Sequence, residues 1–214
     1  QIGEPTRTPT ASPTPTPTAP PYDVAINAGG PTYVDRQGVV WQADKPFSTG
    51  SWGYVGGSAY SITRPISGTT DQPLYQSERY GMTGYAFTVP NGVYDVELRF
   101  AEIYCTSPDC RVFSVIIENN TAISDLDLVR LVGRDTAYVR RFTVPVRDGA
   151  LNITFRTLIN APKLSALRVS SSGSPATPTG TPPMMPTGTP SPTPVASTAT
   201  PTLTPLPTGT ATPR

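Results

Sequence analysis

Proline is concentrated at the two ends of this chain, and that distribution limits where a folded domain can lie. Residues 1–22 and 173–214 hold 19 of the 27 prolines, in runs with Thr, Ser, Ala and Gly. Proline fixes φ and has no backbone N–H, and the small polar residues around it offer little surface to bury. We therefore expect both ends to be disordered Pro/Thr-rich linkers around one domain at residues 23–172.

The middle segment is long enough for a single domain with a substantial core. A domain of about 150 residues buries roughly 70% of the surface of its unfolded chain. The segment holds 14 basic and 14 acidic residues, because only Glu4, Arg7 and Arg214 are charged in the ends. A neutral surface does not attract phosphate backbones or anionic membranes over a distance. We therefore expect neither a nucleic acid nor a membrane as a partner.

Strand patterns dominate the middle segment. Apolar and polar residues alternate over 94–101, 142–146 and 151–155, which predicts strands with one buried face. Residues 111–118 are apolar on both faces, which predicts a central strand. Short turns rich in Gly and Asn separate these runs and predict hairpin-type connections at 90–92 and 147–149. The pattern predicts an all-β fold, an antiparallel β-sandwich of two sheets.

Two cysteines enclose a loop of four residues. Cys105 and Cys110 are the only cysteines in the chain, and the chain has no histidine. Two cysteines alone cannot complete a structural zinc site, so we favour a disulfide. The loop-entropy model gives such a bond about 2 kcal/mol, and the bond would rigidify the neighbouring Tyr104. A disulfide implies an oxidising compartment, so we expect a secreted or cell-surface protein.

Residues 74–104 carry the pattern most typical of a function. Tyrosines occur there at or near the ends of predicted strands, among glutamates and arginines: Tyr75, Tyr80, Tyr85, Tyr94 and Tyr104. A sugar ring has an apolar face of C–H groups that stacks on an aromatic ring, and its hydroxyls bond to fixed polar side chains. The competing interpretation is that most of these tyrosines are core residues with satisfied hydroxyls.

Four sequence motifs narrow the choice. They are Leu74–Gly81 (LYQSERYG), Phe100–Tyr104 (FAEIY), Asn27–Gly30 (NAGG) and Asn160–Leu167 (NAPKLSAL). In their order along the chain they resemble the malectin family of carbohydrate-binding domains, over about residues 24–169. The resemblance implies that the sandwich is a galactose-binding-like jelly roll.

The resemblance also assigns roles to particular residues. In the family, a cluster of aromatic residues and one acidic residue hold a glucosyl disaccharide. The tyrosine that ends the Glu-Arg-Tyr motif is Tyr80 here, and the tyrosine after Phe-Ala-Glu-Ile is Tyr104. An upstream tyrosine of the family site corresponds to Tyr60 or Tyr54, and a length difference over residues 52–60 leaves both open.

Two departures from the family pattern limit what is carried over. Cys105 stands where animal members have Phe, and Asn160 stands where they have an acidic residue. Trp52 is a candidate to replace the missing ring, or else a packing residue. Loss of one aromatic contact removes about 0.5–1.5 kcal/mol, and a neutral amide bonds more weakly than a carboxylate. We therefore expect an α-glucan or another neutral glycan, without the selectivity of animal members for diglucosylated N-glycans.

The residue content argues against catalysis. The absence of histidine excludes Ser-His-Asp and Cys-His mechanisms. Glycoside hydrolysis needs only two carboxylates, for which Glu78 and Glu102 are the obvious pair. Both belong to motifs that serve binding and structure in the family, so we expect a non-catalytic module without a cofactor. Asp125 and Asp127 suggest calcium, but the loop offers few other oxygens, so we expect a capped turn or a solvated loop, and no metal.

The expected architecture is that of a tethered module. Linkers at both ends predict an internal domain of a longer secreted or surface protein, joined covalently to neighbouring domains. Two other functions stay open. One is a peptide- or protein-binding module, which a flat apolar surface would favour. The other is a structural spacer domain, which burial of Tyr80 and Tyr104 would favour.

Overall fold

The computed structural model of this protein describes residues 21–172 and confirms the all-β sandwich. The expected linkers at 1–22 and 173–214 lie outside the described residues, except for residues 21 and 22. Besides the strands there are a 3₁₀ turn, η1 (Gln72–Leu74), and one short helix, α1 (Leu128–Val132). The strands in chain order are β1 (Asp23–Asn27), β2 (Tyr33–Val34), β3 (Val40–Ala43), β4 (Trp52–Ser61), β5 (Ser77–Thr88), β6 (Gly92–Phe100), β7 (Val112–Ile117), β8 (Asn120–Leu126), β9 (Tyr138–Val146), β10 (Ala150–Ile159), β11 (Lys163–Leu164) and β12 (Ala166–Ser171).

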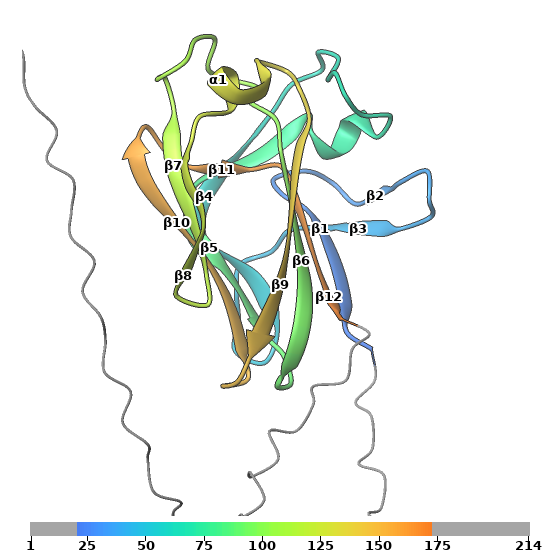
Figure 1. Cartoon of the computed structure of the whole chain (residues 1–214). Helices are drawn as coiled ribbons and strands as arrows, with labels where there is room; N and C mark the ends of the chain where they lie inside the picture. The colour runs from blue at the N-terminus through green and yellow to red at the C-terminus, as the bar shows by residue number, and fades with distance from the viewer. Residues whose placement is uncertain (1–20, 173–214) are drawn as a thin grey trace, which may run out of the picture. The chain divides into compact units, whose positions relative to one another are not determined.

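Two sheets face one another across the core (Figure 1). One has the strand order β2-β3-β1-β12-β6-β9, and the other has the order β11-β5-β10-β7-β8, with β4 paired to β5. All strand pairs are antiparallel except β1 with β3. The strands β8 and β9 are the edges of opposite sheets. The order confirms the prediction of a central strand at 111–118, because β7 lies between β10 and β8.

The predicted alternation places the core. In β6 the residues Tyr94, Val96, Leu98 and Phe100 are buried between the sheets. They pack in one cluster with apolar residues of the facing sheet, including Phe113 of β7. Period-2 alternation was therefore a sufficient signal for the buried face of this strand.

The prediction of hairpins at 90–92 and 147–149 was wrong. These short turns join β5 to β6 and β9 to β10, and each pair of strands belongs to opposite sheets. Turn residues indicate where the chain reverses, but they do not decide whether the two strands hydrogen-bond or fold over a shared core. A true tight hairpin joins β7 to β8, where Glu118 and Asn119 both have positive φ, 49° and 63°. Two consecutive positive φ values fit the twist of paired strands.

The first described residues belong to the domain packing. Tyr22 was assigned to the amino-terminal linker, but its backbone N–H donates to Ser171 Oγ at 2.8 Å and its carbonyl accepts from Ser171 N at 2.7 Å. Its ring meets that of Tyr94 edge to face, with centroids 5.9 Å apart. Burial, and then the neighbouring Tyr94, raise the pKa of Tyr22 to about 12.

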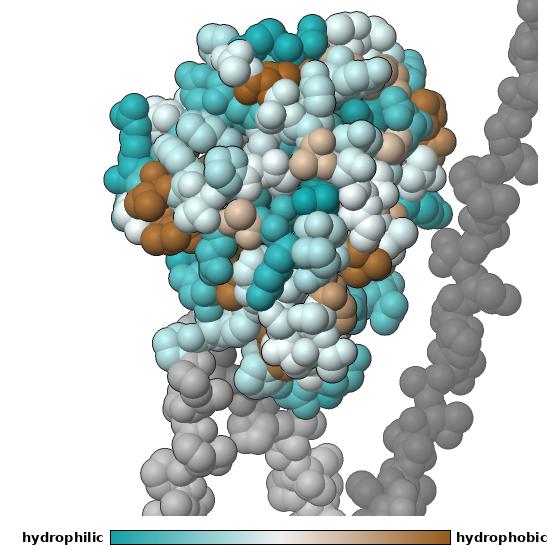
Figure 2. Space-filling view, turned by 180° about the vertical axis from the view of Figure 1, so that it is seen from behind, coloured by the Kyte–Doolittle hydropathy of each residue, from teal (hydrophilic) through white to brown (hydrophobic). Residues whose placement is uncertain are grey.

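The surface is mostly hydrophilic on the face seen from behind (Figure 2). Apolar residues on this face form small groups that hydrophilic residues separate. Large exposed apolar patches mark protein interfaces, and this face does not show one. Among residues 21–172, no helix is long and apolar enough to cross a membrane.

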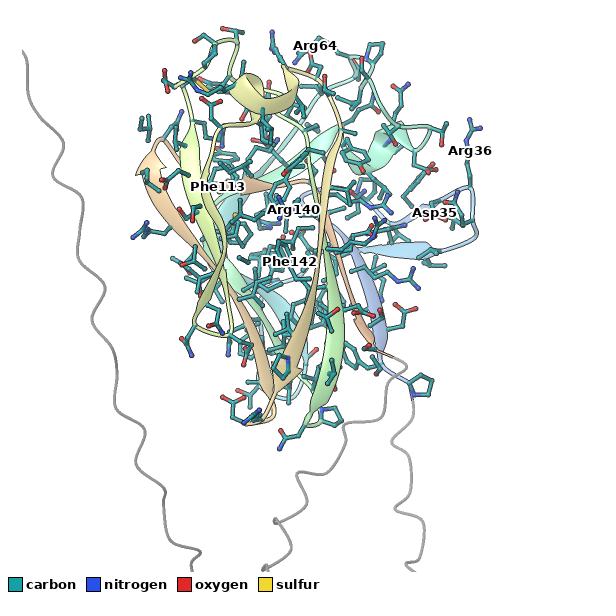
Figure 3. The ribbon with its side chains drawn as sticks, in the orientation of Figure 1. Asp35, Arg36, Arg64, Phe113, Arg140 and Phe142 are labelled. Atoms are coloured by element: carbon teal, nitrogen blue, oxygen red, sulfur yellow. A yellow bond between two sulfur atoms is a disulfide. The ribbon has the colours of Figure 1, made fainter. Side chains whose placement is uncertain are left out.

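A second, smaller core lies beneath the β2–β3 hairpin, which carries Asp35 (Figure 3). The buried Trp41 donates from its indole Nε1 to Asp35 Oδ2 at 2.8 Å, and the Arg99 guanidinium lies 4.3 Å from the Trp41 ring centroid. Burial alone would raise the pKa of Asp35. The bond from Trp41 and those from the backbone N–H groups of Val39 and Gln37 outweigh burial, so this pKa lies below its usual value. This motif is structural.

Candidate functional site

Three of the predicted tyrosines and Asn160 meet at one pocket of about 250 Å³. The pocket lies where the β4–β5 pair, the disulfide loop and the β10–β11 connection come together. Its lining residues are Tyr60, Glu78, Tyr80, Tyr104, Arg111, Asn160 and Ala161.

Strand register places the first part of this lining. Tyr60 in β4 is paired with Glu78 in β5, and Tyr80 follows two residues later. Residues at i and i+2 of a strand share a face, so Glu78 and Tyr80 project to the same side. Tyr80 is also paired with Lys163 of β11, which fixes this end of β5 from both sides.

The tyrosines of the sequence pattern fall into two groups. Tyr75, Tyr85 and Tyr94 are buried and belong to the core, as the competing interpretation required. Tyr80 and Tyr104 are exposed, at 37% and 60%, as is Tyr60 at 38%. Exposed rings fixed on strands and a closed loop can stack on a ligand, because little rotamer freedom remains to be lost.

A buried ion network forms the floor of the pocket. Arg111 Nε lies 3.0 Å from Glu102 Oε2, and Arg111 Nη2 lies 3.9 Å from Glu78 Oε1. Lys163 Nζ pairs with Glu78 Oε2 and donates to the carbonyl of Ala101. All four ionised side chains are more than nine-tenths buried. Two carboxylates and two cations cancel, so the floor has no net charge.

The loop that carries Tyr104 is anchored at both ends. Glu102 Oε1 accepts from the backbone N–H groups of Tyr104 and Cys105, each at 2.9 Å. Cys105 and Cys110 form a disulfide with Cα atoms 5.8 Å apart, which confirms the predicted bond. Arg111 directly follows Cys110. The segment 104–111 therefore positions both the Tyr104 ring and the Arg111 side chain of the pocket floor.

Asn160 stands in a left-handed turn at the rim. Its φ is +57°, a value that Asn tolerates better than most residues. Its Oδ1 accepts from the N–H of Ala161 at 2.7 Å, and the Ala161 carbonyl accepts from Arg111 Nη1 at 2.6 Å. The Asn160 amide therefore keeps its Nδ2 donor for a ligand, while its oxygen is already engaged by the backbone.

The structure does not bring Tyr54 and Trp52 to this pocket. The Arg79 guanidinium lies 3.4 Å from the centroid of the Tyr54 ring, and that guanidinium also bonds to Asp44. Tyr54 thus belongs to a packed cluster of β4 and β5. Trp52, the candidate to replace the missing ring, is the first residue of β4 and is buried in the main core, as the packing alternative required. Lys45 Nζ lies 4.6 Å from the Trp52 ring centroid.

Sequence reasoning missed three lining residues: Glu78, Arg111 and Ala161. Glu78 had a usable signal, since it lies two residues before Tyr80 in a predicted strand and therefore on the same face. Arg111 had none, because it pairs with residues far away in the sequence. Glu78 and Glu102 were weighed as a hydrolytic pair, and both are instead partners of Arg111 in the floor.

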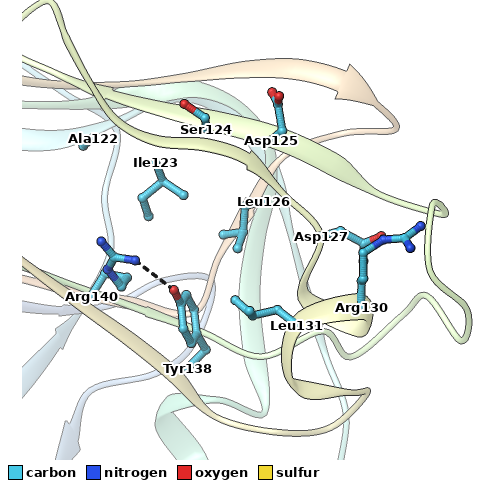
Figure 4. Close-up of a pocket in the computed structure, with 10 residues that line it drawn as sticks. All are labelled: Ala122, Ile123, Ser124, Asp125, Leu126, Asp127, Arg130, Leu131, Tyr138 and Arg140. Atoms are coloured by element: carbon cyan, nitrogen blue, oxygen red, sulfur yellow. Dashed lines mark hydrogen bonds and ion pairs between the residues drawn. The ribbon is translucent and has the colours of Figure 1, made fainter. Parts of the chain in front are cut away.

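A larger concavity of about 530 Å³ lies between β8, α1 and β9 (Figure 4). It has a single aromatic lining residue, Tyr138, whose hydroxyl accepts from Arg140 Nη1 at 3.1 Å. Asp127 caps α1 by accepting from the N–H of Arg130 at 3.0 Å, which confirms the predicted capped turn. Within the described residues no cluster of three or more His, Cys, Asp or Glu could hold a metal ion. The polar groups of this concavity are thus largely engaged with one another.

Comparisons with known proteins agree with the fold and the motifs. The malectin domain model matches residues 22–176. Human malectin is 36% identical over 135 residues, which cover 60% of this chain and 44% of the human protein. Malectin-B of Xenopus laevis is 34% identical over 135 residues, which cover 60% of this chain and 47% of that protein. The chain therefore spans less than half the length of these relatives.

Solved structures with the same fold occur in larger proteins. A Bacteroides uniformis β-glucuronidase has a TM-score of 0.66 at 25% identity, over 71% of this chain and 18% of that enzyme. The ANX2 ectodomain of Arabidopsis thaliana has a TM-score of 0.58 at 18% identity, over 69% of this chain and 49% of that chain. The second likeness is one of fold alone. From the match over residues 22–176, the chain belongs to the malectin domain family, a family of carbohydrate-binding modules.

Proposed function

We propose that this domain binds a neutral oligosaccharide, an α-glucan by preference, in the pocket of Tyr60, Tyr80 and Tyr104, and that it does so without catalysis. The observation that carries the proposal is the convergence of three exposed tyrosines from separate segments on one pocket. Aromatic rings that serve only packing are buried, as Tyr85 is. Rings left open to solvent around a pocket suit a ligand with an apolar face.

The polar lining supports a sugar over a purely apolar ligand. A sugar presents hydroxyls around its ring, and each can donate and accept. Asn160 offers Nδ2 at the rim, and Glu78 and Arg111 line the floor. Such a mixture of stacking surface and a few fixed polar groups is typical of small-molecule sites.

The charge balance supports a neutral ligand. The middle segment has as many acidic as basic residues, and the cations of the floor are paired with carboxylates. An anionic sugar would find no uncompensated cation there. The preference for α-glucans rests on the family resemblance, in which Tyr80 and Tyr104 correspond to residues that hold a glucosyl disaccharide.

The proposal of binding without hydrolysis rests on the state of the two glutamates. A glycosidase needs one carboxylate as acid and a second as base or nucleophile, both facing the scissile bond. Glu102 is engaged with Arg111 and with two backbone N–H groups, and Glu78 is engaged with Lys163. Glu102 cannot exchange a proton with a substrate without breaking this network, and Glu78 is the single carboxylate among the lining residues of the pocket.

We also propose that the domain works outside the cytoplasm, tethered to neighbours through residues 1–21 and 173–214. The disulfide supports an oxidising compartment. A tether raises the effective concentration of a neighbouring domain at the polysaccharide, so that even weak binding is useful.

The test is affinity electrophoresis of the full chain through gels that contain soluble glycans, with Tyr80→Ala and Tyr104→Ala beside the wild type. Phe47→Ala is the matched control, because Phe47 has the same exposure as Tyr60, 38%, but does not line the pocket. We expect retardation by α-glucans that both tyrosine variants lose and that the control keeps. Equal retardation of all four proteins would overturn the proposed site, and no retardation by any glycan would overturn the proposed function.

A further inference from the structure

At the floor of the pocket, two polar atoms of buried side chains stand too far apart to bond to each other. Arg111 Nη2 and Glu78 Oε1 are 3.9 Å apart, and a direct N–H···O bond needs about 2.7–3.2 Å. Both residues line the pocket, and both are more than nine-tenths buried. The proposed stacking of a sugar on the tyrosine rings gives no role to these two atoms.

The other polar atoms of these two side chains face oppositely charged groups or a backbone carbonyl within the floor. Arg111 Nε faces Glu102 Oε2 at 3.0 Å, and Arg111 Nη1 donates to the Ala161 carbonyl at 2.6 Å. Glu78 Oε2 pairs with Lys163. In residues 21–172 no hydrogen bond to Arg111 Nη2 or to Glu78 Oε1 is found, so one donor and one acceptor are left at the floor.

We propose that Arg111 and Glu78 determine specificity by holding one hydroxyl of a neutral sugar between them. The hydroxyl accepts from Arg111 Nη2 and donates to Glu78 Oε1. An oxygen about 2.8 Å from each atom bridges a 3.9 Å separation without movement of either side chain. A hydroxyl is the sugar group that donates and accepts at the same atom.

The same pair excludes charged groups at this position. A carboxylate placed there would be attracted by Arg111 but repelled by Glu78, and an ammonium the reverse, so neither would gain net compensation for its own desolvation. Either charge would be poorly screened, because the floor is buried. Lys163 and Glu102 fix the two side chains from behind, so they cannot turn away from an unsuitable ligand. The inference rests on the proposed function and adds to it the chemical rule by which the site selects a hydroxyl over a charged group.

The experiment combines deletion of single hydroxyls with substitution of the floor. The probes are maltose, isomaltose, nigerose and kojibiose, followed by monodeoxy analogues of whichever disaccharide the wild type binds. Calorimetry with the full chain is expected to show one hydroxyl whose removal weakens binding on the order of 10- to 100-fold, because bonds to charged groups are strong. In Glu78→Gln the penalty at that position shrinks to roughly 3- to 10-fold, since the bond is no longer charge-assisted.

Glu97→Gln is the matched control. Glu97 also pairs with arginines, Arg99 and Arg141, but it lies on the outer face of the other sheet. The Glu97→Gln variant should lose as much affinity as the wild type when the critical hydroxyl is removed. If Glu78→Gln does not fold, ¹⁵N spectra of the Arg111 guanidinium in the wild type replace the titration of that variant. The parent disaccharide should shift these signals, and the critical deoxy analogue should not.

The outcomes separate the two proposals. If the wild type binds none of the four disaccharides and no other neutral glycan, the proposed function fails and this inference fails with it. If the wild type binds but every hydroxyl deletion costs a similar amount, only this inference is overturned. An undiminished penalty in Glu78→Gln, or unmoved Arg111 signals, would overturn it as well.

Discussion

Tyr60 and Tyr104 meet edge to face across the pocket, with ring centroids 6.1 Å apart and ring planes at 85°. One ring belongs to the end of β4, and the other to the segment beside the disulfide. An edge-to-face contact is the favoured geometry for two aromatic rings. Each ring therefore supports the other, and together they form a single wall of the pocket.

This contact predicts that the two tyrosines do not act independently. Tyr60→Ala and Tyr104→Ala should each weaken glycan binding by roughly 1–2 kcal/mol, and the double variant should lose less than the sum. The reason is that each single change already removes the support of the other ring. Calorimetry on the four proteins of the cycle gives the coupling directly, and strictly additive losses would contradict the shared wall.

Opening the disulfide should weaken both stability and binding. The bond closes a short loop between Cys105 and Cys110, for which the loop-entropy model gives about 2 kcal/mol. Tyr104 adjoins Cys105, so its ring should gain freedom that binding must then remove. Urea unfolding and glycan titration of the Cys105→Ser/Cys110→Ser double variant measure the two effects. Unchanged affinity in the variant would show that Glu102 alone positions Tyr104.

Gly29 is predicted to be required for the shape of the pocket floor. A Cβ at Gly29 would lie 2.2 Å from the carbonyl oxygen of Glu78, and its φ is +69°. Gly38 has a similar φ, +83°, but a Cβ there would meet nothing within 4 Å. Gly38→Ala should therefore lower the free energy of unfolding only by the strain of a positive φ. Gly29→Ala should lower it by about 1–3 kcal/mol more, as measured by urea unfolding. Equal costs would mean that the approach of the Asn27–Gly30 loop to β5 is unimportant.

Acid should remove a contribution of Asp35 to stability. The folded pKa of Asp35 lies below its usual value because of the bonds from Trp41, Val39 and Gln37. A lowered folded pKa gives stability that is present above the unfolded pKa, about 3.9, and is lost as pH falls through the folded value. The difference in free energy of unfolding between the wild type and Asp35→Asn should thus be large at pH 7 and should shrink as pH falls below the unfolded pKa and through the folded pKa. Asp148→Asn, at the exposed β9–β10 turn, is the control.

The sequence predicted the parts of the fold that depend on local patterns. Alternation in 94–101 placed the buried face of β6, and the spacing of Cys105 and Cys110 predicted their bond. The partner of each strand was not predictable in the same way. The turn at 90–92 resembles a hairpin turn, yet it carries the chain from one sheet to the other, since pairing depends on strands that are distant in the sequence.

The candidate site was predictable only in its aromatic part. Motif resemblance selected Tyr80, Tyr104 and Asn160, and register now places Tyr60 beside them, with Tyr54 in a packed cluster. Tyr54 and Tyr60 both lie on β4, but Tyr54 is paired with Tyr85 and Tyr60 with Glu78, and the sequence does not show these partners. Arg111 could not be found, because its partners are contributed by other segments of the chain.

The central claim is that a neutral glycan occupies the tyrosine pocket, and its most direct test is an NMR titration of the ¹⁵N-labelled full chain with α-linked glucose disaccharides. The account predicts that signals of Tyr60, Tyr80, Tyr104 and Asn160 shift together along one binding curve, while Tyr138 in the β8–β9 concavity does not move. Shifts that are confined to Tyr138 and its neighbours, or spectra unchanged by every neutral glycan, would contradict it.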